Sequence, residues 1–103
     1  LVVLPSYGPG ETWGLCINEA MNLAKPVLVS SHVACGPDLV IPGQTGWIFP
    51  AGDGEALRTA LADALSDPPR LKAMGQAARA HIESYSYAQT TAGLNRALQA
   101  VLP

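Results

Sequence analysis

Three short apolar runs in the first half of the chain, each bounded by turn-forming residues, constrain its fold more than any other feature. Residues 1–4 and 26–30 are almost continuously apolar and rich in valine and leucine, which is typical of strands covered on both faces. Residues 47–49 follow a glycine-containing turn at 43–46 and predict a third strand. Apolar residues at helical spacing over 14–24 predict a helix between the first two strands. This order predicts an α/β fold with a doubly wound parallel sheet of about three strands and flanking helices.

The second half of the chain changes to helices. Asp53 is a predicted N-cap, and Asp67 is a second one because prolines follow it at the first helical positions. A last helix is predicted to end near Val101, with its leucines on one side. We therefore expect one partial domain over the whole chain, with an α/β part (1–50) and a helical C-terminal tail (51–103).

Charge and composition exclude several classes of function. The 103 residues carry a net charge of -2, with six scattered Lys and Arg residues, so neither a nucleic-acid surface nor a polybasic membrane patch is expected. No apolar run approaches the roughly 20 residues that a membrane-spanning helix needs. Cys16 and Cys35 are expected to be reduced thiols of a cytoplasmic protein. The chain opens with Leu1 inside an apolar run, which favours the interpretation that sequence upstream has been removed.

The segment after the first apolar run has the residues of an anion site. Backbone N–H groups of Gly14, Leu15 and Cys16 are predicted to emerge at the start of the helix, where phosphate groups bind. Glu19 lies roughly 6–8 Å further along the helix at 1.5 Å per residue, and Glu11 precedes the helix. One anion-binding helix end with two carboxylates predicts a nucleotide-sugar pocket, although a surface helix with ordinary glutamates explains the same residues.

These residues closely resemble the donor-binding region of retaining glycosyltransferases with the GT-B fold, the glycosyl transferases group 1. Glu11 and Glu19 are separated by seven residues with Trp13-Gly14-Leu15 between them. The resemblance implies that the sheet is part of a Rossmann-like domain, the C-terminal donor-binding domain of such an enzyme. Further matching blocks are Leu4-Pro5-Ser6, Glu19-Ala20-Met21, residues 25–30, 36–40 and 43–47, and Tyr85-Ser86-Tyr87.

The resemblance also implies a role for each site residue. The substrate is expected to be a nucleoside-diphosphate sugar, with no metal and no other cofactor, and the acceptor is unspecified. In the family an Arg and a Lys upstream of this region neutralise the diphosphate, and this chain has no matching pair, so we expect the fragment to be inactive alone. The implied roles are sugar binding and catalysis by Glu11, sugar positioning by the backbone of Thr12, Trp13 and Gly14, phosphate binding by the N–H groups of Leu15 and Cys16, and ribose binding by Glu19.

Two other functions stay open from the sequence. A nucleotide-sugar epimerase of the same architecture is one, and a non-catalytic nucleotide-binding or assembly module is the other. His32 is expected to be an exposed loop histidine, and Cys35 lacks a neighbouring base that would make it a nucleophile. Exposed sheet edges and the apolar side of the last helix predict self-association of the fragment. The resemblance is also compatible with peripheral membrane association of the full-length protein.

Overall fold

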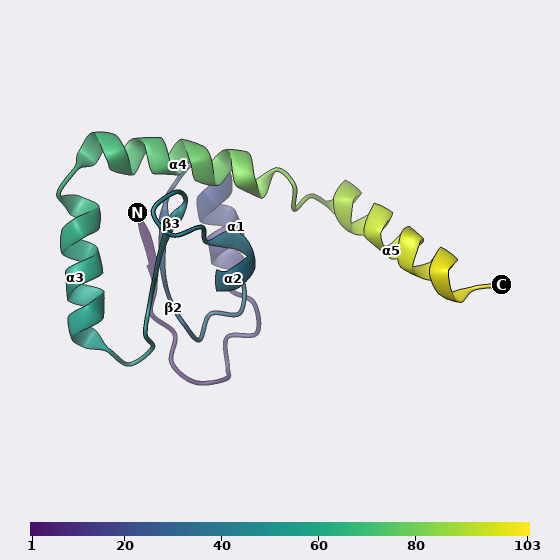
Figure 1. Ribbon diagram of the computed structural model, residues 1–103, viewed down its shortest axis with the longest axis horizontal. Helices are drawn as coiled ribbons and strands as arrows, with labels where there is room; N and C mark the ends of the chain where they lie inside the picture. Colours follow the sequence, from purple (N-terminus) through teal and green to yellow (C-terminus); the bar gives the residue numbers. More distant parts are fainter.

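The computed structural model describes all residues from 1 to 103 and contains one parallel sheet and five helices (Figure 1). Strands β1 (Val2–Leu4), β2 (Val27–Ser30) and β3 (Gly46–Phe49) lie side by side in that order, all parallel. Leu28 of β2 stands between Val3 and Trp47 in the register. The predicted α/β class, with three parallel strands and a helical tail, is confirmed.

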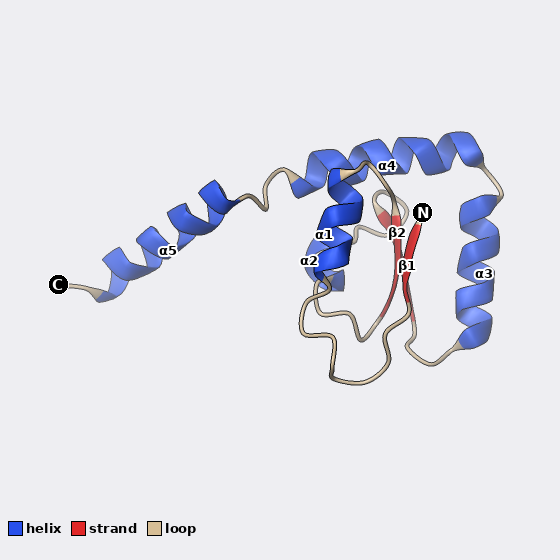
Figure 2. Cartoon of the chain, turned by 180° about the vertical axis from the view of Figure 1, so that it is seen from behind, coloured by secondary structure: helices blue, strands red, loops and turns tan.

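Helices cover both faces of the sheet. The helices α1 (Leu15–Asn22) and α2 (Gly36–Leu39) lie on one side, and α3 (Gly54–Leu65) lies on the other (Figures 1 and 2). The helix α4 (Pro68–Ile82) runs across the end of this layered body, and α5 (Tyr87–Val101) extends away from it. The arrangement leaves the sheet between two helical layers, as a doubly wound fold requires.

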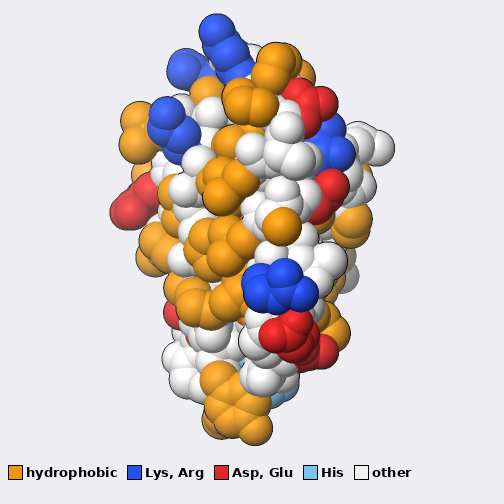
Figure 3. All heavy atoms as spheres, turned by 90° about the vertical axis from the view of Figure 1, so that its left-hand side faces the viewer, with side chains coloured by type: hydrophobic (Ala, Val, Ile, Leu, Met, Phe, Trp, Pro, Cys, Tyr) orange, Lys and Arg blue, Asp and Glu red, His pale blue; other side chains and the backbone are white.

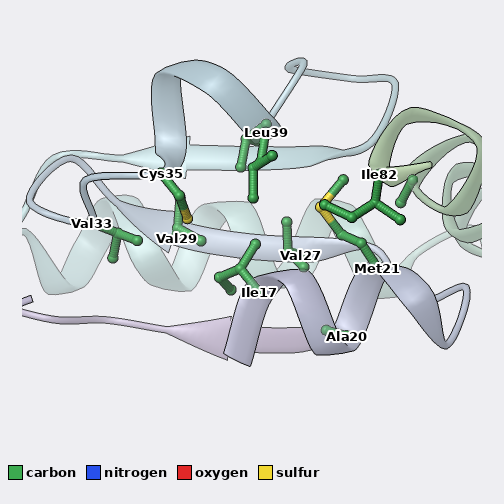
Figure 4. Close-up of a cluster of buried hydrophobic side chains, with 11 residues drawn as sticks. Ile17, Ala20, Met21, Val27, Val29, Val33, Cys35, Leu39 and Ile82 are labelled. Atoms are coloured by element: carbon green, nitrogen blue, oxygen red, sulfur yellow. The ribbon is translucent and has the colours of Figure 1, made fainter. Parts of the chain in front are cut away.

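The main core lies between the sheet and the α1 side. Figure 4 shows Ile17 and Met21 of α1 beside Val27 and Val29 of β2, and all four side chains are fully buried. Each such side chain stabilises the fold by roughly 1.5 to 3 kcal/mol on burial. The helix α4 closes one end of this cluster. The remaining members of the core are Ala20, Val33, Cys35, Leu39, Val40, Ala78 and Ile82.

The strand β1 is not covered on both faces, and that part of the prediction was wrong. Val3 is 36% exposed, and Val2 and Leu4 are only half-buried. The physical reason is that β1 is an edge strand with a single neighbour, while α3 packs against β3 at the opposite edge. An apolar run alone does not distinguish an edge strand from a central one.

The helix α1 is shorter at both ends than the predicted span of 14–24. It ends with Ala24 in a left-handed conformation, at a φ of 53°, and the amide of Lys25 donates to the carbonyl of Ala20 at 2.9 Å. This is the hydrogen-bonding pattern of a Schellman motif, which usually uses glycine at the left-handed position. The carbonyl of Ala24 lies so close to Gly75 of α4 that a Cβ at position 75 would overlap it. Glycine at this point therefore allows α4 to pack directly on the end of α1.

Both predicted aspartate caps are confirmed. The carboxylate of Asp53 accepts a hydrogen bond from the amide of Ala56 at 2.9 Å, at the start of α3. The carboxylate of Asp67 accepts one from the amide of Arg70 at 3.0 Å, at the start of α4. Each cap satisfies an amide that has no partner within its helix.

Apolar surface remains exposed in two places. No residue of α5 is buried, and Leu94 and Leu98 are 59% and 44% exposed. On the side of the molecule where α3 lies, hydrophobic side chains form a band between charged groups (Figure 3). Within α3, Leu65 is 61% exposed. The exposed apolar side predicted for the last helix is thus present.

Candidate functional site

The loops that follow the three strands are tied together at the carboxyl edge of the sheet. The hydroxyl of Ser30 donates a hydrogen bond to the carbonyl of Ser6, which joins the ends of β2 and β1. The amide of Gly8 donates to Nδ1 of His32 at 2.9 Å. Since ligands of open α/β sheets bind outside the carboxyl ends of the strands, this edge is the candidate site. A third link runs from the amide of Ala51, after β3, to the hydroxyl of Ser31 at 3.0 Å.

The start of α1 depends on a glycine. Gly14 has a φ of 98°, in the left-handed region that side chains disfavour. A Cβ there would lie 3.0 Å from Cγ1 of Val33 and 3.2 Å from Cδ2 of Leu4. The carbonyl of Trp13 accepts a hydrogen bond from the amide of Cys35 at 2.9 Å, which holds the helix start against the loop after β2. The start of α1 therefore presents backbone groups, and no side chain, at Gly14.

The first amides of α1 lack partners from within the protein. No side chain caps the helix and no acidic residue lies in its first turn, while the amide of Ile17 is taken by the carbonyl of Gly14. The amides of Leu15 and Cys16 have no helical carbonyl far enough before them in the chain to accept a hydrogen bond, and both residues are exposed. A helix start of this kind has the positive end of the helix dipole and free donors, so it suits an anion.

The structure brings Leu15 and Glu19 together in one cavity and leaves Glu11 out of it. The cavity has a volume of about 670 Å³, and one wall is the exposed side of α1 with Glu19. The other wall consists of the end of α4 and the start of α5, from Ile82 to Thr90. Glu11 is half-buried in the preceding loop, where its Oε2 accepts a hydrogen bond from the hydroxyl of Ser6 at 3.2 Å.

Two contacts at the site were not predicted from the sequence. Nε1 of Trp13 donates to Oδ1 of Asn18 at 2.8 Å, so Asn18 anchors the loop that precedes α1 to the first turns of the helix. At the junction of α4 and α5, the hydroxyl of Tyr85 donates to the carbonyl of Asp38 at 3.1 Å. The matching Tyr85-Ser86-Tyr87 block could have marked this wall of the cavity, whereas nothing in the sequence indicated the role of Asn18. Thr12 belongs to the loop before α1 and is exposed.

The two cysteines are both free thiols in different surroundings. Burial raises the pKa of the Cys35 thiol from 9.0 to about 11, so this group stays protonated at neutral pH. A protonated, buried thiol is a poor nucleophile, which agrees with the expectation that Cys35 does not act as one. Cys16 is exposed on the first turn of α1. No three or more His, Cys, Asp or Glu side chains gather as a metal site, and no helix combines the length and apolar character needed to span a membrane.

A family model described as glycosyl transferases group 1 matches residues 1–81, from β1 through nearly all of α4. The chain belongs to the glycosyl transferases group 1. This match covers every residue placed at the candidate site on α1 and its preceding loop, and it leaves α5 outside.

Named relatives and a solved structure agree with this assignment. The group 1 chain is 36% identical over 84 residues to a lipopolysaccharide core biosynthesis mannosyltransferase of Rhizobium leguminosarum, which covers 82% of the chain and 23% of that protein. It is 35% identical over 94 residues to a D-inositol 3-phosphate glycosyltransferase of Rhodococcus opacus, covering 91% of the chain and 20% of that protein. A sucrose-phosphate synthase from Thermosynechococcus elongatus superposes with a TM-score of 0.78 at 34% identity, over 96% of this chain and 25% of that one. The chain thus spans a quarter or less of these relatives.

Proposed function

We propose that this chain is the donor-binding part of a glycosyltransferase that transfers a sugar from a nucleoside-diphosphate sugar to an acceptor with retention. The observation that carries the proposal is the uncapped, acid-free start of α1 beside a cavity that contains Glu19. Membership of the glycosyl transferases group 1 supports the class of reaction. The names of the two glycosyltransferase relatives also describe sugar transfer.

The geometry suggests how a donor would lie along α1. The amides of Leu15 and Cys16 would donate hydrogen bonds to the diphosphate, because both residues are exposed and their amides have no acceptor within the helix. Glu19 lies one turn further on, about 6 Å along the axis, within reach of ribose hydroxyl groups. Glu11 would contact the reacting sugar from the loop before the helix, with Thr12, Trp13 and Gly14 positioning that sugar through the backbone.

The rest of the reaction is assigned to parts outside this chain. The chain spans a quarter or less of its relatives, so the acceptor site and the cations that neutralise the leaving diphosphate would come from the longer protein. Removing charged partners from a developing diphosphate costs several kcal/mol of transition-state stabilisation. We therefore propose that the isolated chain binds donor and does not transfer sugar.

Calorimetric titration of the chain with UDP, GDP, ADP and their sugar conjugates tests the proposal. Glu19→Gln should weaken the preferred nucleotide about tenfold, since hydrogen bonds to a charged group contribute about 1.5 to 3 kcal/mol. Glu55→Gln is the matched control, because that carboxylate lies on α3 and is 81% exposed in a pair with Arg58. Failure of every nucleotide to bind at millimolar concentration would refute the donor site, and equal affinity of the two variants would refute the assignment of Glu19.

A further inference from the structure

We propose that His32 is a positioning residue of the donor site, which fixes the loop between β1 and α1 and thereby the carboxylate of Glu11. This inference rests on the proposed function, because the orientation of Glu11 matters to a donor sugar bound beside it. Neither the family match nor the sequence resemblance assigns a role to position 32. The histidine is exposed, as expected, yet its ring has partners on the neighbouring loop.

The end of β2 and the residues that follow it hold the first loop on both sides of Tyr7. On one side, the amide of Gly8 donates to Nδ1 of His32 at 2.9 Å. On the other side, the hydroxyl of the fully buried Ser30 donates to the carbonyl of Ser6. The amide of His32 in turn donates to the hydroxyl of Ser30 at 3.3 Å, so both attachments share one short segment. Loss of the imidazole would leave one of these two hydrogen bonds beside Tyr7.

Ring contacts strengthen the attachment at Tyr7. The ring centroids of Tyr7 and His32 are 5.4 Å apart, with the planes tilted by 38°. On the Gly52 side, a Cβ at that residue would lie 3.0 Å from the ring of Tyr7, so the loop after β3 also borders it. Gly8, which follows Tyr7, has a φ of 91°. In this conformation its amide donates to the imidazole of His32.

A hydrogen bond continues from this attachment to Glu11. The hydroxyl of Ser6 donates to Oε2 of Glu11 at 3.2 Å, from the same residue whose carbonyl Ser30 holds. The path from His32 to Glu11 therefore runs through Gly8, Tyr7 and Ser6, all within one loop. Glu11 is half-buried, and its carboxylate accepts a side-chain hydrogen bond from Ser6. The conformation of the loop therefore decides where that carboxylate points.

The contact also defines the state of the imidazole. A nitrogen that accepts a hydrogen bond carries no proton, so the neutral ring must have its proton on Nε2, on the far side from Gly8. The ring borders an open cavity of about 360 Å³ together with Gly8 and Pro9. The tautomer is thus a direct spectroscopic signature of the positioning contact.

Nuclear magnetic resonance of the labelled chain tests the attachment without any ligand. Imidazole nitrogen shifts should report Nδ1 of His32 as the unprotonated nitrogen, and His32→Ala should speed amide exchange at Gly8 about fivefold, the equivalent of one hydrogen bond. His32→Asn should restore slow exchange, because Oδ1 can accept in place of Nδ1. His81→Ala is the matched control, since that histidine contacts the carbonyl of Asp38 on α2. A protonated Nδ1, or unchanged exchange in His32→Ala, would overturn the proposal.

Titration with a nucleoside diphosphate and with its hexose conjugate tests the consequence for Glu11. His32→Ala should weaken the sugar conjugate about fivefold and leave the free diphosphate within about twofold, because only the sugar would contact Glu11. His32→Asn should recover the lost affinity. Equal losses for both ligands would overturn the positioning role of His32. Absence of nucleotide binding by the unchanged chain would overturn the donor site itself, and the two failures are thereby distinct.

Discussion

Replacing Gly14 by alanine is expected to lower the free energy of unfolding by about 2 to 5 kcal/mol through two separate costs. The first is backbone strain, because Gly14 has a φ of 98° and a left-handed residue with a Cβ costs about 1 to 2 kcal/mol. The second is overpacking, since the new methyl group would lie 3.0 Å from Cγ1 of Val33 and 3.2 Å from Cδ2 of Leu4. Overpacking of this kind costs typically about 1 to 3 kcal/mol.

Urea unfolding followed by far-ultraviolet circular dichroism measures this loss. Gly43→Ala is the control, because Gly43 also has a positive φ, of 75°, and no heavy atom lies within 4 Å of a Cβ built there. The control should show the strain cost alone, about 1 to 2 kcal/mol. The difference between the variants isolates the contacts of Gly14 with Val33 and Leu4. Equal losses would refute the close packing described at the start of α1.

Three further predictions concern the two thiols and the last helix. Because burial raises the pKa of Cys35 from 9.0 to about 11, the folded chain favours the protonated thiol. The free energy of unfolding should therefore fall as the pH rises from 9 towards 11, and Cys35→Ser should flatten that fall in urea titrations; identical pH profiles would contradict the assignment. Cys16 should react with a thiol reagent in the folded chain while Cys35 stays protected, as mass spectrometry of the labelled protein can determine. Light scattering over a range of concentrations should show self-association that weakens when Leu94 and Leu98 are both changed to Gln, and an unaltered mass distribution would argue against α5 as the contact.

Much of the fold follows from local sequence. The apolar runs predicted all three strands, and their order along the chain predicted a parallel sheet because short connections and right-handed crossovers leave few alternatives. Asp53 and Asp67 marked the starts of α3 and α4, since a carboxylate at the N-cap accepts a hydrogen bond from an amide of the first turn. These are interactions between residues close in sequence, and the sequence displays them directly.

Other features depended on contacts between distant segments. The exposure of Val3 depends on which strand lies beside β1, which an apolar run does not encode. The left-handed Ala24 and the glycine at position 75 form a matched pair about fifty residues apart. Alanine is not a residue that predicts a helix end, and an isolated helical glycine predicts only lower stability, so neither was recognisable alone.

The candidate site was predicted in part. The sequence placed the amide of Leu15 at the start of a helix and Glu19 further along it, and in the structure both residues line one cavity. Glu11 precedes the helix, where no periodicity fixes the backbone, and its orientation depends on Ser6 and the loops beyond it. The contact between Gly8 and His32 joins residues 24 positions apart, so helical or strand periodicity could not have revealed it.

The outward course of α5 has a consequence for any surface that comes to cover it. A lone helix of 15 residues is at the limit of stability in water, and α5 buries none of its side chains against the rest of the chain. A partner that covers Leu94 and Leu98 would therefore have to restrain the backbone of the segment as well as dehydrate its leucines. Part of the attraction would be consumed by that ordering, so contacts through this helix should be weaker than their buried area implies and more sensitive to temperature.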